Sequence, residues 1–339
     1  QLSSTDAFEI PRFDTDSGSL LEPVFDVITD SEIQQTEVEV LWRLADQPVR
    51  SASTLRGDLV SSMTMSMVNT RLFERLQGGE SVLLSASAGV SDYLRSAQIV
   101  RLSGTAGPDT LKAALGEILV EIERARQHGF DPEELELELA SARAQVDQVF
   151  AASDTRQDSD IARELVAYSL DRWIPTTAID QQLIANQVLD SITLDDVQRF
   201  LFDVLETNPY VLLTGSASDE DALATPEELA EGYNNIVGTQ VATAVRTASS
   251  ITELMERPGP AAIIDEQRIA PLDATIVTYE NGARLVFRQT QITENIVRLR
   301  AVSPGGSFAV DGPEVPLLDH SALLVAGSGY ESIDIVTLD

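Results

Sequence analysis

The sequence predicts an α+β domain in which helices pack on one face of a sheet that is rich in antiparallel strands. Residues 37–44 alternate between apolar and polar side chains, which is typical of a half-buried strand. Residues 54–77 instead carry apolar side chains at helical spacing. Two strands, several helices and a final strand follow, and this order favours the α+β class.

Each predicted element has its own local pattern. The first strand carries Val38, Val40, Trp42 and Leu44 on one side. The helix at 54–77 ends at Gly78 and Gly79, because glycine tolerates the backbone conformation that closes a helix. Asp131-Pro132-Glu133-Glu134 begins another helix, which extends to about residue 150, with a cap, a proline and an acid at the third position. The other predicted elements are strands at 81–90, 97–104 and 210–214 and helices at 108–127, 159–171, 178–189 and 194–205.

A hairpin is predicted near the C-terminal end. Two strand-type runs flank Asn281-Gly282, a pair that favours a turn in which both positions have φ > 0. A third strand-type run at 295–302 ends in Ser303-Pro304-Gly305-Gly306, and an apolar stretch begins at Pro316. Too little chain follows for a domain of about 100 residues, so part of this module is expected to lie elsewhere.

These patterns divide the chain into four parts. Residues 1–24 are polar and are expected to lead into an α+β domain at 25–237. Residues 238–271 contain several prolines and little periodicity, so a linker is expected, because structureless stretches of this length are uncommon within a domain. Residues 272–339 are expected to form the first strands and first helix of a partial further domain.

The composition excludes several classes of function. The formal net charge of −32 opposes binding to nucleic acid or to an anionic membrane, both of which require cationic side chains. No apolar run is long enough for a transmembrane helix, and the absence of cysteine excludes thiolate catalysis and thiolate metal sites. A solvated acidic surface is the favoured interpretation of the charge, and attraction of cationic peptides or metal ions is the alternative.

Catalytic candidates are few. His128 is expected at a helix C-terminus beside Gly129, a position that favours imidazole for structural reasons. His320 lies on an apolar stretch with Asp319 and Ser321, and three adjacent residues cannot converge on one reacting atom as a triad. The sequence contains no H-x-x-E-H, H-E-x-x-H, G-x-S-x-G or phosphate-binding loop.

Other notable residues are better explained by structure. The acidic pairs Glu133-Glu134 and Asp195-Asp196 are expected in first helical turns, where carboxylates offset unpaired N–H groups, with a calcium or acid–base role as the alternative. Three methionines at every second position are expected to pack in the core rather than to bind a cofactor. They are Met63, Met65 and Met67.

Three short patterns occur in a recognisable order. Asn69 to Leu72 ends a predicted helix, and Arg71 and Arg75 flank Glu74 there, which suggests a solvated or interdomain ion pair. Gly129 to Leu135 forms a step between two helices, and Ser303 to Ser307 reads S-P-G-G-S after the Asn-Gly turn. This series resembles the pitrilysin/insulinase-type (inverzincin) zinc metallopeptidases in their long, two-half form. It is similar to their second, non-catalytic domain, the linker and the start of the third domain.

That resemblance implies a processing-peptidase-like (LuxS/MPP-like metallohydrolase) fold, repeated twice in each half. It also implies zinc in a first domain, held by H-x-x-E-H and a later Glu. In an ungapped alignment of the third domain, Leu318, Ser321 and Ala322 occupy the motif positions, with His320 between them. We therefore expect no catalytic, cofactor-binding or metal-binding residue in this chain.

The expected function is that of the non-catalytic middle portion of a zinc metalloendopeptidase, which encloses and positions peptides for hydrolysis elsewhere. Its expected partners are a separate N-terminal catalytic domain, the remainder of the C-terminal half and the peptide substrate. The chain alone is expected to be inactive. The alternative is a non-peptidase scaffold or regulatory subunit that retains the fold. By resemblance we expect the bacterial periplasm or cell envelope, with the cytoplasm as the alternative.

Overall fold

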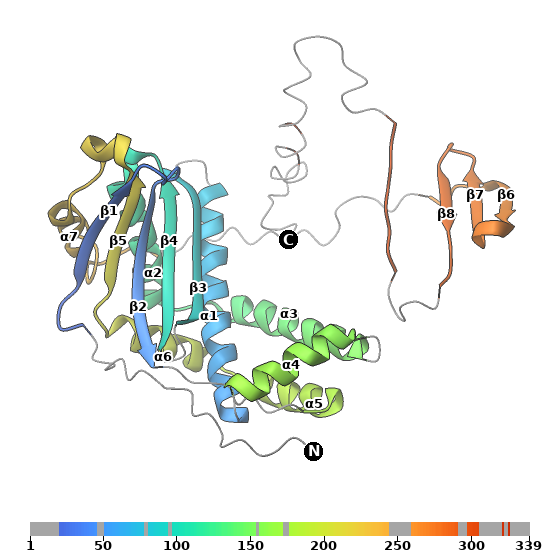
Figure 1. Ribbon diagram of the computed structural model, residues 1–339, viewed down its shortest axis with the longest axis horizontal. Coiled ribbons are helices and arrows are strands. Elements are labelled where there is room, and N and C mark those ends of the chain that lie inside the picture. The colour runs from blue at the N-terminus through green and yellow to red at the C-terminus, as the bar shows by residue number, and fades with distance from the viewer. Residues whose placement is uncertain are drawn as a thin grey trace, which may run out of the picture. The chain divides into compact units, whose positions relative to one another are not determined.

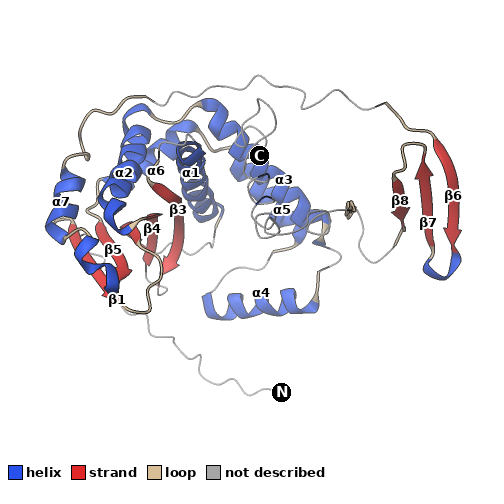
Figure 2. Ribbon diagram, turned by 90° about the horizontal axis from the view of Figure 1, so that it is seen from above, coloured by secondary structure: helices blue, strands red, loops and turns tan. Residues whose placement is uncertain are grey.

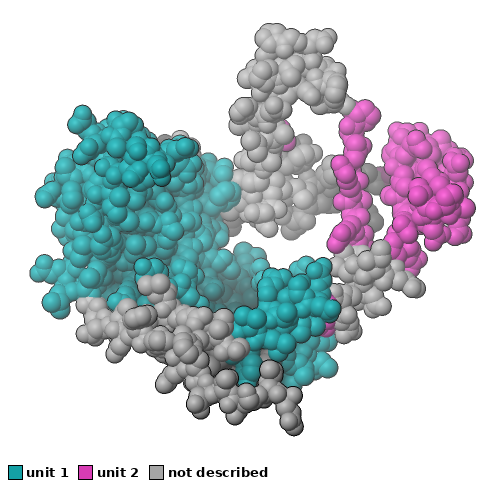
Figure 3. Space-filling view, in the orientation of Figure 1, with its two compact units in different colours: residues 1–150, 157–245 teal, residues 151–156, 246–339 magenta. Residues whose placement is uncertain are grey.

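The computed structural model describes residues 20–45, 51–77, 81–93, 97–153, 156–171, 176–243, 259–290, 297–304, 321 and 325. The chain forms two compact units, which are considered separately (Figure 3). Unit 1 comprises residues 1–150 and 157–245, and unit 2 comprises residues 151–156 and 246–339.

Unit 1 is organised around a five-stranded mixed sheet with the order β1-β5-β2-β4-β3 (Figure 1). The strands are β1 (Val24–Asp30), β2 (Glu37–Ala45), β3 (Leu83–Tyr93), β4 (Ala97–Ala106) and β5 (Tyr210–Ser216). β1 is parallel to β5, and the other neighbouring pairs are antiparallel. The register places Val40 of β2 between Leu102 of β4 and Val211 of β5, and all three side chains are fully buried.

Helices cover one face of this sheet. The helices of unit 1 are α1 (Ala52–Gln77), α2 (Leu111–His128), α3 (Pro132–Ala151), α4 (Asp158–Asp171), α5 (Ala178–Leu189), α6 (Leu194–Leu205) and α7 (Pro226–Asn234). α1, α2, α6 and α7 contact the strands, whereas α3, α4 and α5 lie to one side of the layered body (Figures 1 and 2). The alternation of β2 explains this layering, because its buried side chains, including Trp42, point toward the helices.

α1 is buried on several sides. It contacts β3, α2, α5 and α6, so apolar side chains are needed around much of its circumference. Met63, Met65 and Met67 are at most 4% exposed. The prediction that these methionines pack in the core is therefore confirmed.

Unit 2 contains a three-stranded antiparallel sheet, β6-β7-β8. Its strands are β6 (Ile263–Ile269), β7 (Ala274–Tyr279) and β8 (Arg284–Phe287). The predicted hairpin joins β7 to β8, but its turn differs from the expectation. Gly282 has φ of +83° and Asn281 does not have positive φ. Gly282 N–H donates to Tyr279 O at 3.0 Å, which closes a three-residue loop that requires the left-handed conformation only at the glycine.

Three further differences from the predicted elements concern strands. β1 was not predicted, and β6 lies within the range 238–271 that was expected as a linker. The described part of the third strand-type run, residues 297–302, is assigned to no strand. Its apolar side chains Val297 and Leu299 are 94% and 83% exposed, as expected of an extended segment without a partner strand among the described residues.

Candidate functional site

The described residues contain no metal site. Among them, no group of three or more His, Asp or Glu side chains lies close enough to hold a metal ion. His320, Leu318 and Ala322 lie outside the described residues, while Ser321 is helical. The prediction that the C-terminal part has no zinc ligands therefore stays a prediction.

His128 is the last residue of α2, as its position beside Gly129 predicts. Its Nε2 lies 2.8 Å from the main-chain oxygen of Val241. The imidazole is exposed and is hydrogen-bonded to a main-chain carbonyl, an arrangement without a nucleophile for it to activate. The sequence could place His128 on α2, but not identify Val241 as its partner.

The two helical motifs that carry the family resemblance meet in space. Arg71 donates from Nε and Nη2 to the two carboxylate oxygens of Glu134, at 2.9 and 2.7 Å. A third bond from Arg71 Nη2 reaches Gly129 O at 2.9 Å, and the guanidinium lies 4.7 Å from the Phe130 ring centroid. The side chains of Arg71 and Glu134 are 4% and 3% exposed. This bidentate pair ties the end of α1 to the step between α2 and α3.

Glu134 also completes the N-terminal cap of α3. Its Oε2 accepts the main-chain N–H of Asp131 at 2.7 Å, as expected of an acid at the third helical position. The prediction that Glu133-Glu134 lies in a first helical turn and offsets unpaired N–H groups is thus confirmed. The prediction that Arg71 belongs to a solvated or interdomain ion pair is wrong, because this side chain is buried within unit 1.

Asp196 has the structural role predicted for the second acidic pair. It forms a capping box with Thr193, whose main-chain N–H donates to Asp196 Oδ2 at 2.8 Å. Burial opposes ionisation of Asp196, but hydrogen bonds from Thr193 and Arg56 outweigh it and lower the pKa of this carboxyl. A carboxylate so engaged in a cap and an ion pair is a poor general acid.

The face of the sheet opposite the helices is a further candidate surface for binding. It carries polar side chains that pair across strands, and no described helix packs on it (Figure 1). Arg101 of β4 contacts both Glu37 and Glu39 of β2. Burial raises the pKa of Glu39, Arg101 opposes this shift, and Glu37 adds to it.

Hydroxyl groups lie on other strands of this face, together with apolar side chains such as Leu41, Leu212 and Ile28. Ser85 and Thr105 lie 2.8 Å apart between β3 and β4, and Tyr210 OH donates to Asp26 at 2.8 Å between β5 and β1. Such a surface offers hydroxyl and carboxylate groups to a ligand, but no described nucleophile–base pair. These residues were not singled out from the sequence, although the alternation along β2 contains the signal that identifies Glu37 and Glu39.

Two hollows accompany the helices. One, of about 280 Å³, lies between α1, α3 and α5 and is lined mainly by apolar side chains such as Leu55, Val146 and Leu189. The other, of about 310 Å³, lies at the C-terminal end of α2 and the first turns of α6, beside His128. The first hollow has no titratable side chain in its lining, so it offers apolar contact and the amides of Gln145, Gln181 and Gln182 but no acid–base group.

This chain resembles a curated protein, and the similarity covers most of this chain. The probable zinc protease PqqL of Escherichia coli (strain K12) is 22% identical over 324 residues, which cover 93% of this chain and 34% of PqqL. The chain thus spans about a third of the length of this relative. No protein-family model matches the chain.

Solved structures define the fold. Periplasmic PqqL from Escherichia coli superposes with a TM-score of 0.63 at 18% identity, covering 95% of this chain and 36% of PqqL. The first half of PqqL gives 0.62 at 16% identity and covers 68% of this chain and 50% of that structure. A predicted insulinase-family protease from Yersinia pestis gives a TM-score of 0.55 at 17% identity, covering 64% of this chain and 46% of that structure. The chain therefore has the α+β fold of insulinase-family peptidases, with a mixed sheet and packed helices, and the predicted fold class is confirmed.

Among the helices of the described residues, none combines the length and the apolar character that a membrane span requires.

Proposed function

We propose that this chain is the non-catalytic middle portion of a two-half zinc metalloendopeptidase related to PqqL. It comprises the second domain, the linker and the start of the third domain, and it encloses and positions peptides that a separate first domain hydrolyses. Zinc and its ligands belong to that first domain. By analogy with periplasmic PqqL, the proposed compartment is the bacterial periplasm or cell envelope.

The observation that carries this proposal is the extent of the match. The similarity covers 93% of this chain but 34% of a probable zinc protease. The first half of PqqL covers 68% of the chain, and the complete protein covers 95%. A segment that begins within the first half of a PqqL-like protein and continues into its second half accounts for these two coverages.

The chemistry of unit 1 agrees with a positioning role. The H-x-x-E-H motif of an inverzincin site does not occur in the sequence, and the prominent acids of unit 1 serve caps and ion pairs. The open sheet face offers hydroxyl and carboxylate groups that suit the main chain and cationic side chains of a peptide.

The first test is the gene that encodes this chain. Under the proposal, the reading frame upstream of Gln1 encodes H-x-x-E-H and a later Glu. A frame that lacks this motif would contradict the peptidase assignment.

The second test uses the chain itself. Purified protein with added zinc is incubated with unstructured peptides, with and without EDTA. We expect no EDTA-sensitive cleavage, and any such activity would show that the catalytic site has been placed in the wrong domain.

A scaffold or regulatory subunit is the second candidate, because it can retain the fold without the zinc ligands. An intact upstream motif favours the peptidase, and its absence favours the scaffold.

A further inference from the structure

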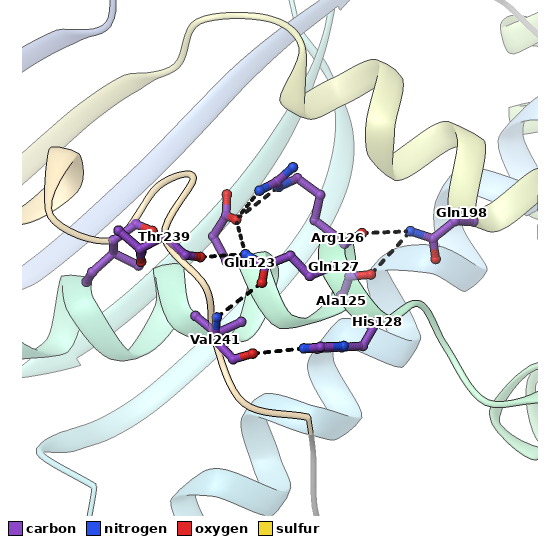
Figure 4. A network of polar contacts seen from close by, with 9 residues as sticks. Glu123, Ala125, Arg126, Gln127, His128, Gln198, Thr239 and Val241 are labelled. Carbon is purple, nitrogen blue, oxygen red and sulfur yellow. Dashed lines mark hydrogen bonds and ion pairs between the residues drawn. The ribbon is translucent and has the colours of Figure 1, made fainter.

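The last turn of α2 holds the main chain of residues 239–242, which follow α7. Gln127 uses both ends of its amide: Nε2 donates to Thr239 O at 2.6 Å, and Oε1 accepts the N–H of Val241 at 3.1 Å (Figure 4). In an extended chain, the C=O of one residue and the N–H two residues later point to the same side. One glutamine amide therefore recognises this segment as a neighbouring β-strand would.

Glu123 fixes the orientation of that amide. Gln127 Nε2 also donates to Glu123 Oε2 at 3.0 Å, and an ionised carboxylate can only accept. Arg126 holds the same oxygen through Nε and Nη2, at 2.9 and 2.6 Å. With its nitrogen committed to Glu123 and Thr239, the amide presents its oxygen to Val241.

Two neighbouring side chains extend the contact. His128 Nε2 lies 2.8 Å from Val241 O, and Arg124 Nε donates to Ala242 O at 2.9 Å. Every one of these bonds reaches a main-chain atom of the segment. Its recognition is therefore independent of the side chains that it carries.

A side chain of α6 stabilises the C-terminal end of α2. Gln198 of α6 donates through Nε2 to Ala125 O and Arg126 O, at 3.2 and 3.4 Å (Figure 4). Ala125 O also accepts Gly129 N–H at 2.9 Å, whereas Arg126 O is one of the last carbonyls of the helix, which lack intrahelical partners, and the Gln198 amide supplies one. The side chains of the last turn are then directed to the segment at 239–242.

We infer that the last turn of α2 is a binding site for extended peptide main chain, occupied by the chain's own residues 239–242. We call this arrangement the α2 clasp: Arg124, Gln127 and His128 with residues 239–242. The clasp sets the point from which the chain leaves unit 1 toward β6 of unit 2.

Release of the clasp lengthens that connection. With the clasp closed, the connecting chain begins at residue 243, and with it open the chain begins at Gly238, whose φ of +77° ends the turn after α7. The added residues extend the reach by on the order of 15 Å, at the usual rise of an extended chain. The role of the α2 clasp in setting the length of this connection rests on the proposed function, in which the connection is the linker between two peptidase halves.

Hydrogen exchange tests the clasp at one amide. We expect the Val241 N–H to be protected in the wild-type chain and about tenfold less protected in Gln127→Leu, which removes its acceptor. Gln127→Glu keeps the size of the side chain but places an acceptor against Thr239 O, and it should also release the segment. Gln240→Leu is the matched control, because Gln240 is exposed within the segment and its side chain takes no part in the clasp.

A distance measurement between the two units tests whether release of the α2 clasp lengthens the connection. The chain contains no cysteine, so Asp221→Cys in unit 1 and Leu272→Cys in unit 2, both exposed, can carry a fluorescent donor and acceptor. We expect a broader and longer distance distribution in the two Gln127 variants and none of this change in Gln240→Leu.

Two different outcomes would contradict the two parts of this inference. A Val241 amide that is unprotected in the wild type, or unaffected by both Gln127 variants, would overturn the binding site. Loss of protection without a change in the distance distribution would overturn its role in the connection. Neither readout involves zinc or cleavage, so failure here is separate from failure of the proposed peptidase assignment.

Discussion

At the scale of single residues, the Arg71–Glu134 ion pair is buried within unit 1 and links α1 to α3. Both side chains are at most 4% exposed, so removing one partner leaves an uncompensated charge in the core. We expect Arg71→Met to lower the free energy of unfolding by about 3–5 kcal/mol in urea denaturation. Arg71→Lys should also be less stable than wild type, because an ammonium cannot donate in the bidentate geometry.

The double variant Arg71→Met/Glu134→Leu separates charge burial from packing. It replaces both ionic groups with apolar ones and should recover much of the lost stability. A double variant as unstable as Arg71→Met would contradict this explanation.

Glu121 gives a prediction about pH. It is 2% exposed, and its Oε1 has no hydrogen-bond partner among the described residues. Burial raises its pKa above the ordinary value of 4.5, although Arg124, Arg71 and Arg75 oppose the shift. Above pH 4.5 the folded state therefore binds more protons than the unfolded state, and this carboxyl lowers stability as the pH rises through that range.

The expected result is that Glu121→Gln is more stable than wild type at pH 7. The difference should shrink as the pH falls through 4.5, because below this ordinary pKa the carboxyl is neutral in both the folded and the unfolded state. Urea denaturation at several pH values measures it. A difference that grows on acidification would show the opposite sign of linkage.

The sequence identified several of these residues without their partners. Asn69 to Leu72 and Gly129 to Leu135 were recognised as motifs, and Glu134 was placed in a first helical turn. Their convergence was not predicted, because Arg71 and Glu134 are 63 residues apart in sequence. Helical spacing brought Arg71 together with Glu74 in the prediction, whereas tertiary packing turns its guanidinium inward to Glu134.

At the scale of elements, the joint between α2 and α3 depends on Gly129. Its φ of 74° and ψ of −167° fall in a region that only glycine populates readily. A Cβ at this position would also lie 3.1 Å from Gln198 Oε1. We expect Gly129→Ala to cost about 1–3 kcal/mol of stability in chemical denaturation.

Gly89 of β3 provides the matched control for that substitution. Its φ is not positive, and a Cβ there would meet no atom within 4 Å. Gly89→Ala should therefore change stability little. Equal losses in the two variants would show that the backbone conformation at Gly129 is not the cause.

Helices were predicted better than edge strands. The predicted helix at 178–189 matches α5, and that at 194–205 matches α6, because capping residues and apolar spacing are local signals. β1 was missed because none of its side chains is fully buried, so it lacks the strong contrast between apolar and polar positions that marks β2. β6 was missed because its side chains are mostly exposed, so no alternation between buried and exposed positions marks it.

At the scale of the whole molecule, the two units differ in how much apolar surface they bury. The described core cluster runs from Val38 to Tyr233 and lies entirely in unit 1. In unit 2, Ala274 and Val277 are the buried apolar side chains among the described residues, whereas Ile264 and Val286 are more than 60% exposed. A three-stranded sheet needs a covered apolar face for independent stability.

This difference predicts how the two parts behave when separated. A fragment of residues 1–245 should unfold cooperatively in urea, because it retains the sheet, its covering helices and the core between them. A fragment of residues 246–339 should show no cooperative transition by circular dichroism, because its sheet lacks an apolar layer among the described residues. A sharp transition in the second fragment would mean that it completes its own core. That result would contradict the proposal that it is the start of a longer domain.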